Sequence, residues 1–416
     1  MYQASLNTSL KKVLIIKQIY TITVYASQKY RMILPQKEYT TFRTTDFLQY
    51  KTKRSSCDIL GHQKEAHIIY LSSALSHHLQ IDDAQQVILW KEGAHCSLYH
   101  PFAIMLHQHP SRSKWLTLLQ ELTETGKTLG FLTVCFTLKH VDRTNKRLTA
   151  AVWEDKQWQA LEIVIPPRIY NRLPNRKIEA HPFHQSIIED LSSTAIIFNK
   201  GFFNKWNVYD QLKQQEDLAY LLPECIFHPS ISTIAQQLEE KAIKLYQTNQ
   251  YYSLMIEKKQ DHFIAYPVLG KSKQFTNLTE LISECFSNNL DAIVLQEMLS
   301  LGYPYMIRVH TIHTDKWEIV LRYGRHPDNQ RTHRLETTNI PQDKLNKVDR
   351  LALQISQTLT KKKIAELAFD FAIDKEGRIW LQEVYAKPSW DIFLESEFAA
   401  HTTEYFGKLL QSQIAD

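Results

Sequence analysis

The stretch IAELAFDFAIDKEGRIWLQEVYAKPS, residues 364–389, decides the fold class of this chain. It predicts two β-strands joined by a tight turn at Asp-Lys-Glu-Gly, because β-branched and aromatic residues recur on both sides of that turn. Side chains alternate between the faces of a strand, so each strand carries one acid, Asp370 or Glu383, away from its apolar row. If the loop has an even number of residues, the two acids share one face. The row expected to be buried beneath them is Phe369, Phe371, Ile373 and Trp380.

Two carboxylates on one face of a hairpin can hold a hard divalent cation. Mg²⁺ prefers carboxylate oxygens, and its remaining ligands are usually water and phosphate oxygens. Asp370 and Glu383 are therefore candidate metal ligands. The alternative is a solvated face above a buried one, because charged side chains are mostly exposed. The residues by themselves favour that simpler alternative.

A resemblance to a known family favours the metal site instead. The stretch resembles the metal-binding end of an ATP-grasp domain, and more specifically the YheC/YheD family of ATP-grasp proteins, which is linked to the coat of bacterial endospores. The family pattern is an acid on a hydrophobic strand, a D-x-x-G turn, and then W-x-x-E-x-N-x-K-P. Tyr385 occupies the position of the pattern's Asn. The residues that match are Asp370, Gly377, Trp380, Glu383, Lys387 and Pro388.

The likeness extends upstream in the order that the family has. A weaker match begins near His67, so the likeness covers most of residues 66–392. Taken together and in this order the segments are specific, although each alone is short. The three clearer segments are IPPRIYNRLPNRKIE (165–179), FNKGFFNKWNVYDQL (198–212) and LLPE (221–224).

The pattern and the resemblance together predict an α/β (α+β) fold in four parts. An ATP-grasp-like domain is expected over residues 196–416, preceded by an α/β pre-ATP-grasp domain over 111–195 and a small β-rich module over 61–110. Residues 1–60 form a basic extension with ten Lys or Arg against three Asp or Glu. Such an extension can attach to an anionic surface. An irregular arm, or residues upstream of the translation start, is the favoured alternative, and no specific nucleic acid is expected, because basic and aromatic side chains do not interleave there.

The resemblance also implies residues that bind the nucleotide. Lys205 matches the lysine that opens the ATP-grasp core and reaches phosphates, and Lys244 stands in for the lysine of the family's flexible hairpin. Gln296 and Glu297 end a strand that would present backbone groups to adenine. Arg308 matches the arginine of the family's D-x-R pair and is the candidate catalytic residue, since it would neutralise charge that develops during phosphoryl transfer. ATP and Mg²⁺ are the implied cofactors.

Four elements of the family pattern are changed. The flexible hairpin carries K-P-x-x-G-S-x-G-x-G, whose glycines let backbone N–H groups approach phosphate, whereas this chain has no glycine in residues 202–269. An ordered hairpin without a nest of N–H groups is expected over residues 246–256. Tyr385 is a poor Mg²⁺ ligand, Met306 replaces the Asp of the D-x-R pair, and the later T-N-x-x-x-G-G segment is lost in residues 325–339.

These departures favour a binding function over catalysis. The favoured hypothesis is a degenerate ATP-grasp scaffold that serves spore-coat assembly or another protein interaction, with millimolar-range ATP binding at most and no turnover. On this hypothesis, Asp370→Asn and Glu383→Gln change neither thermal stability nor ATP binding much. The alternative is an ATP- and Mg²⁺-dependent carboxylate–amine ligase that acts through an acyl phosphate. The residues leave open whether the chain is an enzyme, because fold alone does not fix function.

Composition and the absence of certain patterns argue against other classes of protein. Apolar residues make up 44% and charged residues 22% of the chain, which is ordinary for globular domains. No stretch approaches the roughly 20 apolar residues of a membrane helix, and Lys17 and Gln18 interrupt the apolar run in residues 11–27, which argues against an export signal. The five cysteines form no CxxC pair, which indicates reduced thiols. The expected location is the cytoplasm or the spore of an endospore-forming bacterium.

Overall fold

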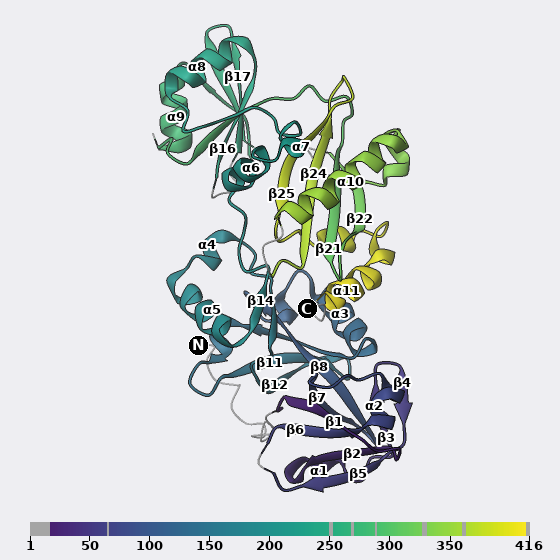
Figure 1. The fold of residues 1–416 in the computed structure, drawn as a ribbon. Coiled ribbons are helices and arrows are strands. Elements are labelled where there is room, and N and C mark those ends of the chain that lie inside the picture. The colour runs from purple at the N-terminus through teal and green to yellow at the C-terminus, as the bar shows by residue number, and fades with distance from the viewer. Residues whose placement is uncertain are drawn as a thin grey trace. The chain divides into compact units, whose positions relative to one another are not determined.

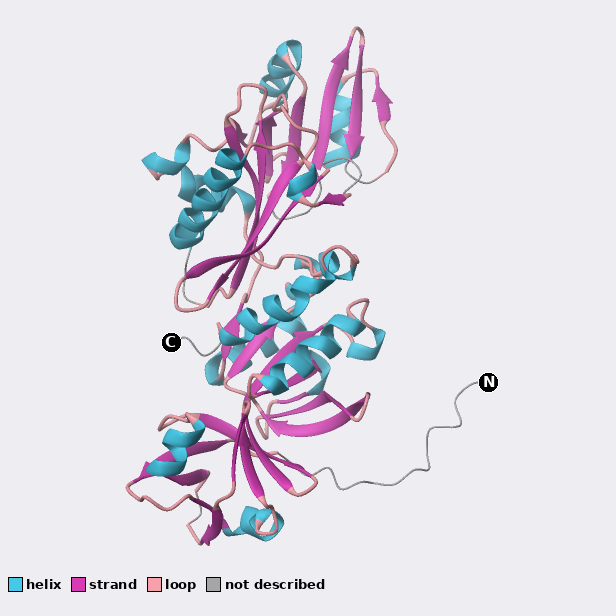
Figure 2. Cartoon of the chain, turned by 90° about the vertical axis from the view of Figure 1, so that its right-hand side faces the viewer, coloured by secondary structure: helices cyan, strands magenta, loops and turns pink. Residues whose placement is uncertain are grey.

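The structure is a computed structural model that describes residues 17–64, 66–248, 253–267, 270–287, 289–326, 331–359 and 363–412. The chain divides into two compact units. Unit 1 contains the residues up to Lys200 together with the C-terminal helix that begins at Thr402, and unit 2 runs from Gly201 to His401. Both units combine sheets with helices (Figure 2), which confirms the α/β (α+β) class. The four-part division expected from the sequence stays a prediction.

Unit 1 is built on one extended sheet with helices packed against it (Figure 1). Its strands are β1 (Tyr20–Tyr25), β2 (Arg31–Pro35), β3 (Phe47–Tyr50), β4 (Lys53–Ser55), β5 (Asp58–His62), β6 (Ile68–Ser72), β7 (Gln86–Glu92), β8 (His95–Leu106), β9 (Phe131–Thr137), β10 (Val141–Asp142), β11 (Arg147–Glu154), β12 (Gln157–Val164), β13 (Arg168–Asn171) and β14 (Ile196–Phe198). Its helices are α1 (Gln36–Phe42), α2 (Ser73–Leu79), α3 (Leu116–Thr128), α4 (Arg176–Glu179), α5 (Pro182–Thr194) and α11 (Thr402–Gln411), with 3₁₀ turns at Pro110–Arg112 and Leu138–His140.

Strand β8 joins the two halves of this sheet. It pairs with β7 in antiparallel orientation and with β9 and β13 in parallel orientation. Every residue from Cys96 to Leu106 is buried, which is typical of a strand that is covered on both faces. The N-terminal strands are therefore continuous with the parallel layer β14–β13–β8–β9.

The expectation of an irregular basic arm over residues 1–60 is wrong for the part that the structure describes. Strand β1 pairs with β6, and β2 pairs with both β5 and β6. Ile22, Met32 and Leu48 are completely buried. The high content of Lys and Arg does not distinguish a strand from an irregular arm. Long basic side chains can cover the outer face of a strand while the alternate residues are buried.

The C-terminal helix α11 packs on α3 within unit 1. Thr403 Oγ1 donates a hydrogen bond of 2.8 Å to Glu121 Oε1 of α3. Along the sequence, the chain therefore runs through unit 1, then through unit 2, and ends in unit 1 again. The apolar residues that α11 buries are Tyr405, Phe406, Leu409 and Leu410.

Unit 2 contains a six-stranded and a five-stranded sheet in its described residues. Helices α8 and α9 cover the first sheet, β15–β20–β16–β17–β18–β19, and α10 covers the second, β23–β22–β21–β24–β25 (Figure 1). The strands are β15 (Cys225–Phe227), β16 (Ile243–Gln247), β17 (Ser253–Lys259), β18 (His262–Pro267), β19 (Lys273–Phe275), β20 (Ile293–Glu297), β21 (Met306–His313), β22 (Trp317–Arg325), β23 (Thr332–His333), β24 (Glu366–Ile373) and β25 (Ile379–Tyr385). The helices are α6 (Lys205–Lys213), α7 (Glu216–Ala219), α8 (Ile231–Glu240), α9 (Leu278–Phe286) and α10 (Gln342–Leu359), with 3₁₀ turns at Leu335–Thr337, Asp391–Leu394 and Ala399–His401.

Strands β24 and β25 form the hairpin that the sequence predicts. Asp370 lies directly opposite Glu383, so the prediction that the two acids share a face is confirmed. Phe369, Phe371 and Ile373 lie in the hydrophobic core beneath them. The period-two pattern of the sequence thus places both acids above an apolar layer.

Trp380 is buried, as predicted, but it does not belong to this row. A β-bulge makes Gln382 an extra residue on β25, so the side chains between Gln382 and the hairpin turn lie on the faces opposite to those expected from simple alternation. Leu381 enters the core instead. Trp380 lies on the acid face, where its Nε1 donates a hydrogen bond of 2.7 Å to Asp374 Oδ2.

Strands β16 and β17 form the hairpin predicted over residues 246–256. Tyr246 lies opposite Ser253, and the two strands pair in antiparallel orientation. The turn between them, residues 249–252, lies outside the described residues, and so does the expectation that no phosphate nest forms there.

Two expectations from composition also concern the whole chain. None of the helices that the structure describes has the length and apolar character needed to cross a bilayer. No disulfide bond is present among the described residues.

Candidate functional site

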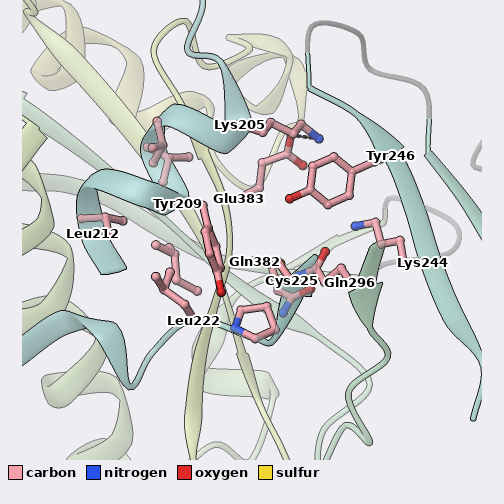
Figure 3. Close-up of a pocket in the computed structure, with 14 residues that line it drawn as sticks. Lys205, Tyr209, Leu212, Leu222, Cys225, Lys244, Tyr246, Gln296, Gln382 and Glu383 are labelled. Atoms are coloured by element: carbon pink, nitrogen blue, oxygen red, sulfur yellow. Dashed lines mark ion pairs between the residues drawn. The ribbon is translucent and has the colours of Figure 1, made fainter. Parts of the chain in front are cut away.

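A pocket lies between the two sheets of unit 2, bounded by α6, β15, β16, β20 and β25 (Figure 3). It brings together four of the residues predicted from the sequence: Lys205, Lys244, Gln296 and Glu383. The other residues that line it are Val208, Tyr209, Leu212, Leu222, Pro223, Cys225, Tyr246, Leu381, Gln382 and Val384.

The start of helix α6 places Lys205 at this pocket. Asn204 Oδ1 accepts hydrogen bonds from the backbone N–H groups of Trp206 at 2.9 Å and Asn207 at 3.2 Å, so Asn204 is the N-cap of this helix. Lys205 Nζ lies 2.7 Å from Glu383 Oε1. A cation in the first turn opposes the helix dipole, and the carboxylate offsets that unfavourable interaction.

Lys244 enters the pocket from β16, opposite Gln296 of β20. Its Nζ lies 6.0 Å from the ring centroid of Tyr246. Among the described residues it forms no hydrogen bond and no ion pair. Burial lowers the pKa of the Lys244 ammonium, and the neighbouring Lys205 lowers it further. The pocket therefore contains an amine that no acid of the described residues contacts directly.

Asp370 is held by arginines. Arg308 Nε donates to Asp370 Oδ1 at 2.7 Å and Arg308 Nη2 donates to Oδ2 at 2.6 Å, while Arg325 Nη1 lies 3.6 Å from Oδ2. The side chains of Arg308 and Asp370 are only 6% and 2% exposed. Burial alone would raise the pKa of the Asp370 carboxyl, but Arg308 outweighs burial and the pKa lies below its ordinary value. Asp370 is thus ionised and engaged at both oxygens.

Tyr385 connects the two acids. Its hydroxyl lies 2.8 Å from Glu383 Oε2 and 3.1 Å from Asp370 Oδ2. Burial raises the pKa of this hydroxyl well above its ordinary value, and both carboxylates act in the same direction. The phenol therefore stays protonated, and its O–H group donates a hydrogen bond to the carboxylates of Asp370 and Glu383, which together are called the acid pair. The guanidinium of Arg308 lies 4.4 Å from the centroid of the Tyr385 ring.

This arrangement does not fit a Mg²⁺ ion. All four carboxylate oxygens of Asp370 and Glu383 already have a donor on Arg308, Lys205 or Tyr385. Mg²⁺ demands near-octahedral oxygen ligands at about 2.0–2.1 Å. Throughout the described part of the chain, no three His, Cys, Asp or Glu side chains gather in a way that could hold a metal. The donor set fits a chain of ion pairs and hydrogen bonds.

Two residues predicted for the site have other partners. Glu297 accepts hydrogen bonds from Lys241 Nζ at the end of α8 at 3.3 Å and from the backbone N–H of Glu224, just before β15, at 2.8 Å. Arg308 is engaged with Asp370. Their proposed roles in adenine binding and catalysis stay predictions.

Sequence reasoning missed two contributors to the acid pair. Tyr385 was read as a lost metal ligand, although its two-residue spacing from Glu383 already put both side chains on one face. No pattern in the sequence indicates that Arg325 contacts Asp370. Arg325 belongs to β22 and reaches Asp370 from another strand of the sheet, so the contact depends on the tertiary structure.

Comparison with known proteins identifies relatives over most of the chain. The family described as YheC/D like ATP-grasp matches residues 194–412. The endospore coat-associated protein YheD of Bacillus subtilis (strain 168) is 26% identical over 374 residues, which cover 82% of this chain and 77% of that protein.

Solved structures with a similar arrangement are ligases and synthetases of low identity. The D-alanine-D-alanine ligase from Coxiella burnetii has a TM-score of 0.49 at 10% identity and covers 76% of this chain and 94% of its own. The N5-carboxyaminoimidazole ribonucleotide synthetase from Thermotoga maritima has a TM-score of 0.46 at 8% identity, over 75% of this chain and 76% of its own. Because the family match spans more than half of the chain and includes both the pocket and the acid pair, the chain belongs to the YheC/D-like ATP-grasp family.

Proposed function

We propose that this protein is a degenerate ATP-grasp scaffold of the YheC/D type that binds a partner and makes weak or no use of ATP. The observation that carries the proposal is the acid pair. The oxygens of Asp370 and Glu383 are occupied by Arg308, Lys205 and Tyr385 rather than left open toward a metal. A bound Mg²⁺ would neutralise charge on transferring phosphate.

Admitting a metal would require breaking buried contacts. Asp370 would have to release Arg308, whose side chain is 6% exposed. Removing one partner from a buried ion pair costs about 3–5 kcal/mol, because the other charge stays buried. Phosphoryl transfer depends on positioning and on electrostatic clamping of the phosphates. The arrangement therefore favours binding over turnover.

The missing glycines support the same proposal. The hairpin β16–β17 lies within residues 202–269, which contain no glycine. Glycine lets backbone N–H groups approach phosphate closely, because it has no Cβ and tolerates positive φ. Fewer such donors mean weaker ATP binding, since each hydrogen bond to a charged group contributes about 1.5–3 kcal/mol.

We place the scaffold in the endospore coat, with a coat protein as its partner. The support is the relative named endospore coat-associated protein YheD. In a spore-forming host, an antibody against this protein should detect it in the extracted coat fraction of purified spores. Detection in the mother-cell cytoplasm alone would contradict this location.

Titration calorimetry with ATP and Mg²⁺, together with an assay of phosphate release, tests the scaffold proposal. We expect ATP binding no tighter than the millimolar range and no phosphate release above a protein-free control. The variant Glu383→Gln should behave like the wild type in both assays, as should the control Glu189→Gln, which changes an exposed residue of unit 1. Micromolar, Mg²⁺-dependent ATP binding that disappears in Glu383→Gln alone would overturn the proposal.

The second candidate is the carboxylate–amine ligase that acts through an acyl phosphate. The convergence of Lys205, Lys244 and Gln296 on one pocket favours it, because these residue types suit phosphate and adenine. Phosphate release that depends on both an added carboxylate and an added amine would establish this candidate instead.

A further inference from the structure

The N-terminal part of unit 1 contains a structural repeat. Residues 31–42 form β2 and α1, and residues 68–79 form β6 and α2, with a strand of five residues and a helix of seven in each copy. The strands β2 and β6 pair with each other in antiparallel orientation. The strand that precedes each copy pairs in parallel with the other copy, since β1 pairs with β6 and β5 pairs with β2. Strand β5 is therefore the counterpart of β1.

The two counterpart strands differ at their second edge. Strand β1 pairs there with β7 in antiparallel orientation. Strand β5 ends the strand order of the sheet and pairs only with β2 among the described strands (Figure 1). It contains no Lys or Pro, the residues that commonly protect an exposed edge. Because unpaired N–H and C=O groups are a template for another strand, the repeat indicates that β5 can accept an antiparallel strand.

The pairing with β2 determines which backbone groups of β5 point outward. The N–H of Asp58 donates to the carbonyl oxygen of Tyr30, just before β2, at 3.0 Å. The backbone groups of successive residues point to opposite sides of a strand, so those of Ile59 and Gly61 point away from β2. If two copies of β5 run antiparallel with Leu60 at the centre, Ile59 of each copy lies opposite Gly61 of the other. Each of these pairs can exchange both N–H···O bonds.

A row of partly exposed apolar side chains ends at this edge. Tyr70 of β6 lies opposite Ile33 of β2, and Ile33 lies beside Leu60 of β5. The Leu60 side chain is 42% exposed. In the antiparallel arrangement Leu60 would face Leu60 of the second copy as a non-hydrogen-bonded pair, in which side chains lie closest. The apolar row would therefore continue across the two-fold axis into the second molecule.

The charges on β5 favour this register. Asp58 would lie opposite His62 of the second copy, so that no like charges meet. A shift by two residues toward the start of β5 would instead place Asp58 opposite Asp58, which is unfavourable. The edge is thus complementary to itself, as the contact between two identical subunits around a two-fold axis requires.

We propose that the outer edge of β5 is a self-association surface, at which two copies of this chain pair their β5 strands in antiparallel orientation about Leu60. The two sheets then form one continuous sheet. Each copy contributes one strand of five residues, which is far less than a permanent interface buries, so the association is weak and reversible. The dimer carries two copies of unit 2 and can bind a partner at two points. This inference concerns unit 1 and holds whether or not unit 2 uses ATP.

Sedimentation equilibrium of the full-length protein tests the self-association. From about 10 µM to about 1 mM, we expect the average mass to rise reversibly from that of one chain toward that of two. Leu60→Lys should weaken the dimer about tenfold or more, because two ammonium groups would then face each other at the axis. Leu394→Lys is the matched control, since Leu394 lies in unit 2 and is 47% exposed. It should dimerise like the wild type. Thermal unfolding establishes that each variant is folded.

Oxidative cross-linking tests the register. In a non-hydrogen-bonded antiparallel pair the two Cα atoms lie about 4.5 Å apart, a separation that a disulfide can bridge. Mild oxidation of Leu60→Cys should therefore give a covalent dimer in higher yield than oxidation of the wild type. Leu394→Cys is the control for an added exposed thiol, and its yield should match that of the wild type.

Three results would overturn this inference. The first is a mass of one chain over the whole concentration range, which would leave the β5 edge to a strand of a different protein. The second is a dimer of equal affinity in Leu60→Lys and Leu394→Lys, which would place the contact elsewhere on the molecule. The third is an equal yield of covalent dimer from Leu60→Cys and Leu394→Cys.

Discussion

Arg308 and Asp370 form a buried ion pair, so losing one partner should be strongly destabilising. We expect Arg308→Met to lower the free energy of unfolding by about 3–5 kcal/mol, because it leaves a buried carboxylate unpaired. Urea unfolding measures the change. Arg322→Met is the control: Arg322 pairs with Asp349, but the two side chains are 38% and 24% exposed. Such a pair contributes about 1 kcal/mol or less, and equal losses in the two variants would contradict the burial of the first pair.

The same pair changes the expectation for Asp370→Asn. The sequence suggested little effect on stability, but Asp370 is 2% exposed and bonded to Arg308 through both oxygens. The neutral amide would leave the guanidinium without its counter-charge. We therefore expect this variant to be clearly less stable than the wild type at neutral pH.

The acid pair also predicts how stability depends on pH. Burial would raise the pKa of each carboxyl, but Arg308 beside Asp370 and Lys205 beside Glu383 outweigh it and lower both pKa values. A lowered pKa in the folded state stabilises the protein above the unfolded pKa of about 4, and this stabilisation is lost as the pH falls through the folded value. The difference in unfolding free energy between the wild type and Asp370→Asn should therefore shrink from about pH 7 to about pH 3 in urea titrations. A difference that stays constant would mean that Asp370 is not held in its ionised form.

At the scale of the element, the N-cap of α6 positions a pocket residue. Asn204→Ala should lower the free energy of unfolding by about 1 kcal/mol, because two backbone N–H groups lose their acceptor. Asn277→Ala is the matched control, since Asn277 caps α9 through the N–H of Glu280 at 2.8 Å. Hydrogen exchange should increase at the start of α6, which carries Lys205, in the first variant only. Unchanged exchange in α6 would show that other contacts fix this turn.

At the scale of the whole molecule, α11 makes the end of the chain part of unit 1. Ending the chain at His401 should expose apolar surface of α3, because α11 packs there with Leu409 and Leu410 completely buried. Hydrogen exchange should then rise in residues 116–128 and stay unchanged in β24, which belongs to unit 2. A chain that ends at Ser412 is the control. Increased exchange in β24 alone would contradict the assignment of α11 to unit 1.

Local pattern allowed much of unit 2 to be predicted from the sequence. The shared face of Asp370 and Glu383 follows from the two-residue period of a strand. The family follows from several short motifs in a fixed order, and the match over residues 194–412 bears it out. Each of these inferences uses residues that are close in sequence.

By itself, the sequence determined the family, the α/β class and the two acids above an apolar layer. Only the tertiary structure decided what surrounds those acids. Arg308 is 62 positions from Asp370 along the chain, and the bulge at Gln382 changes which side chains face the core. The physical reason is that side-chain alternation is a property of one strand, whereas strand register and ion pairing depend on long-range packing.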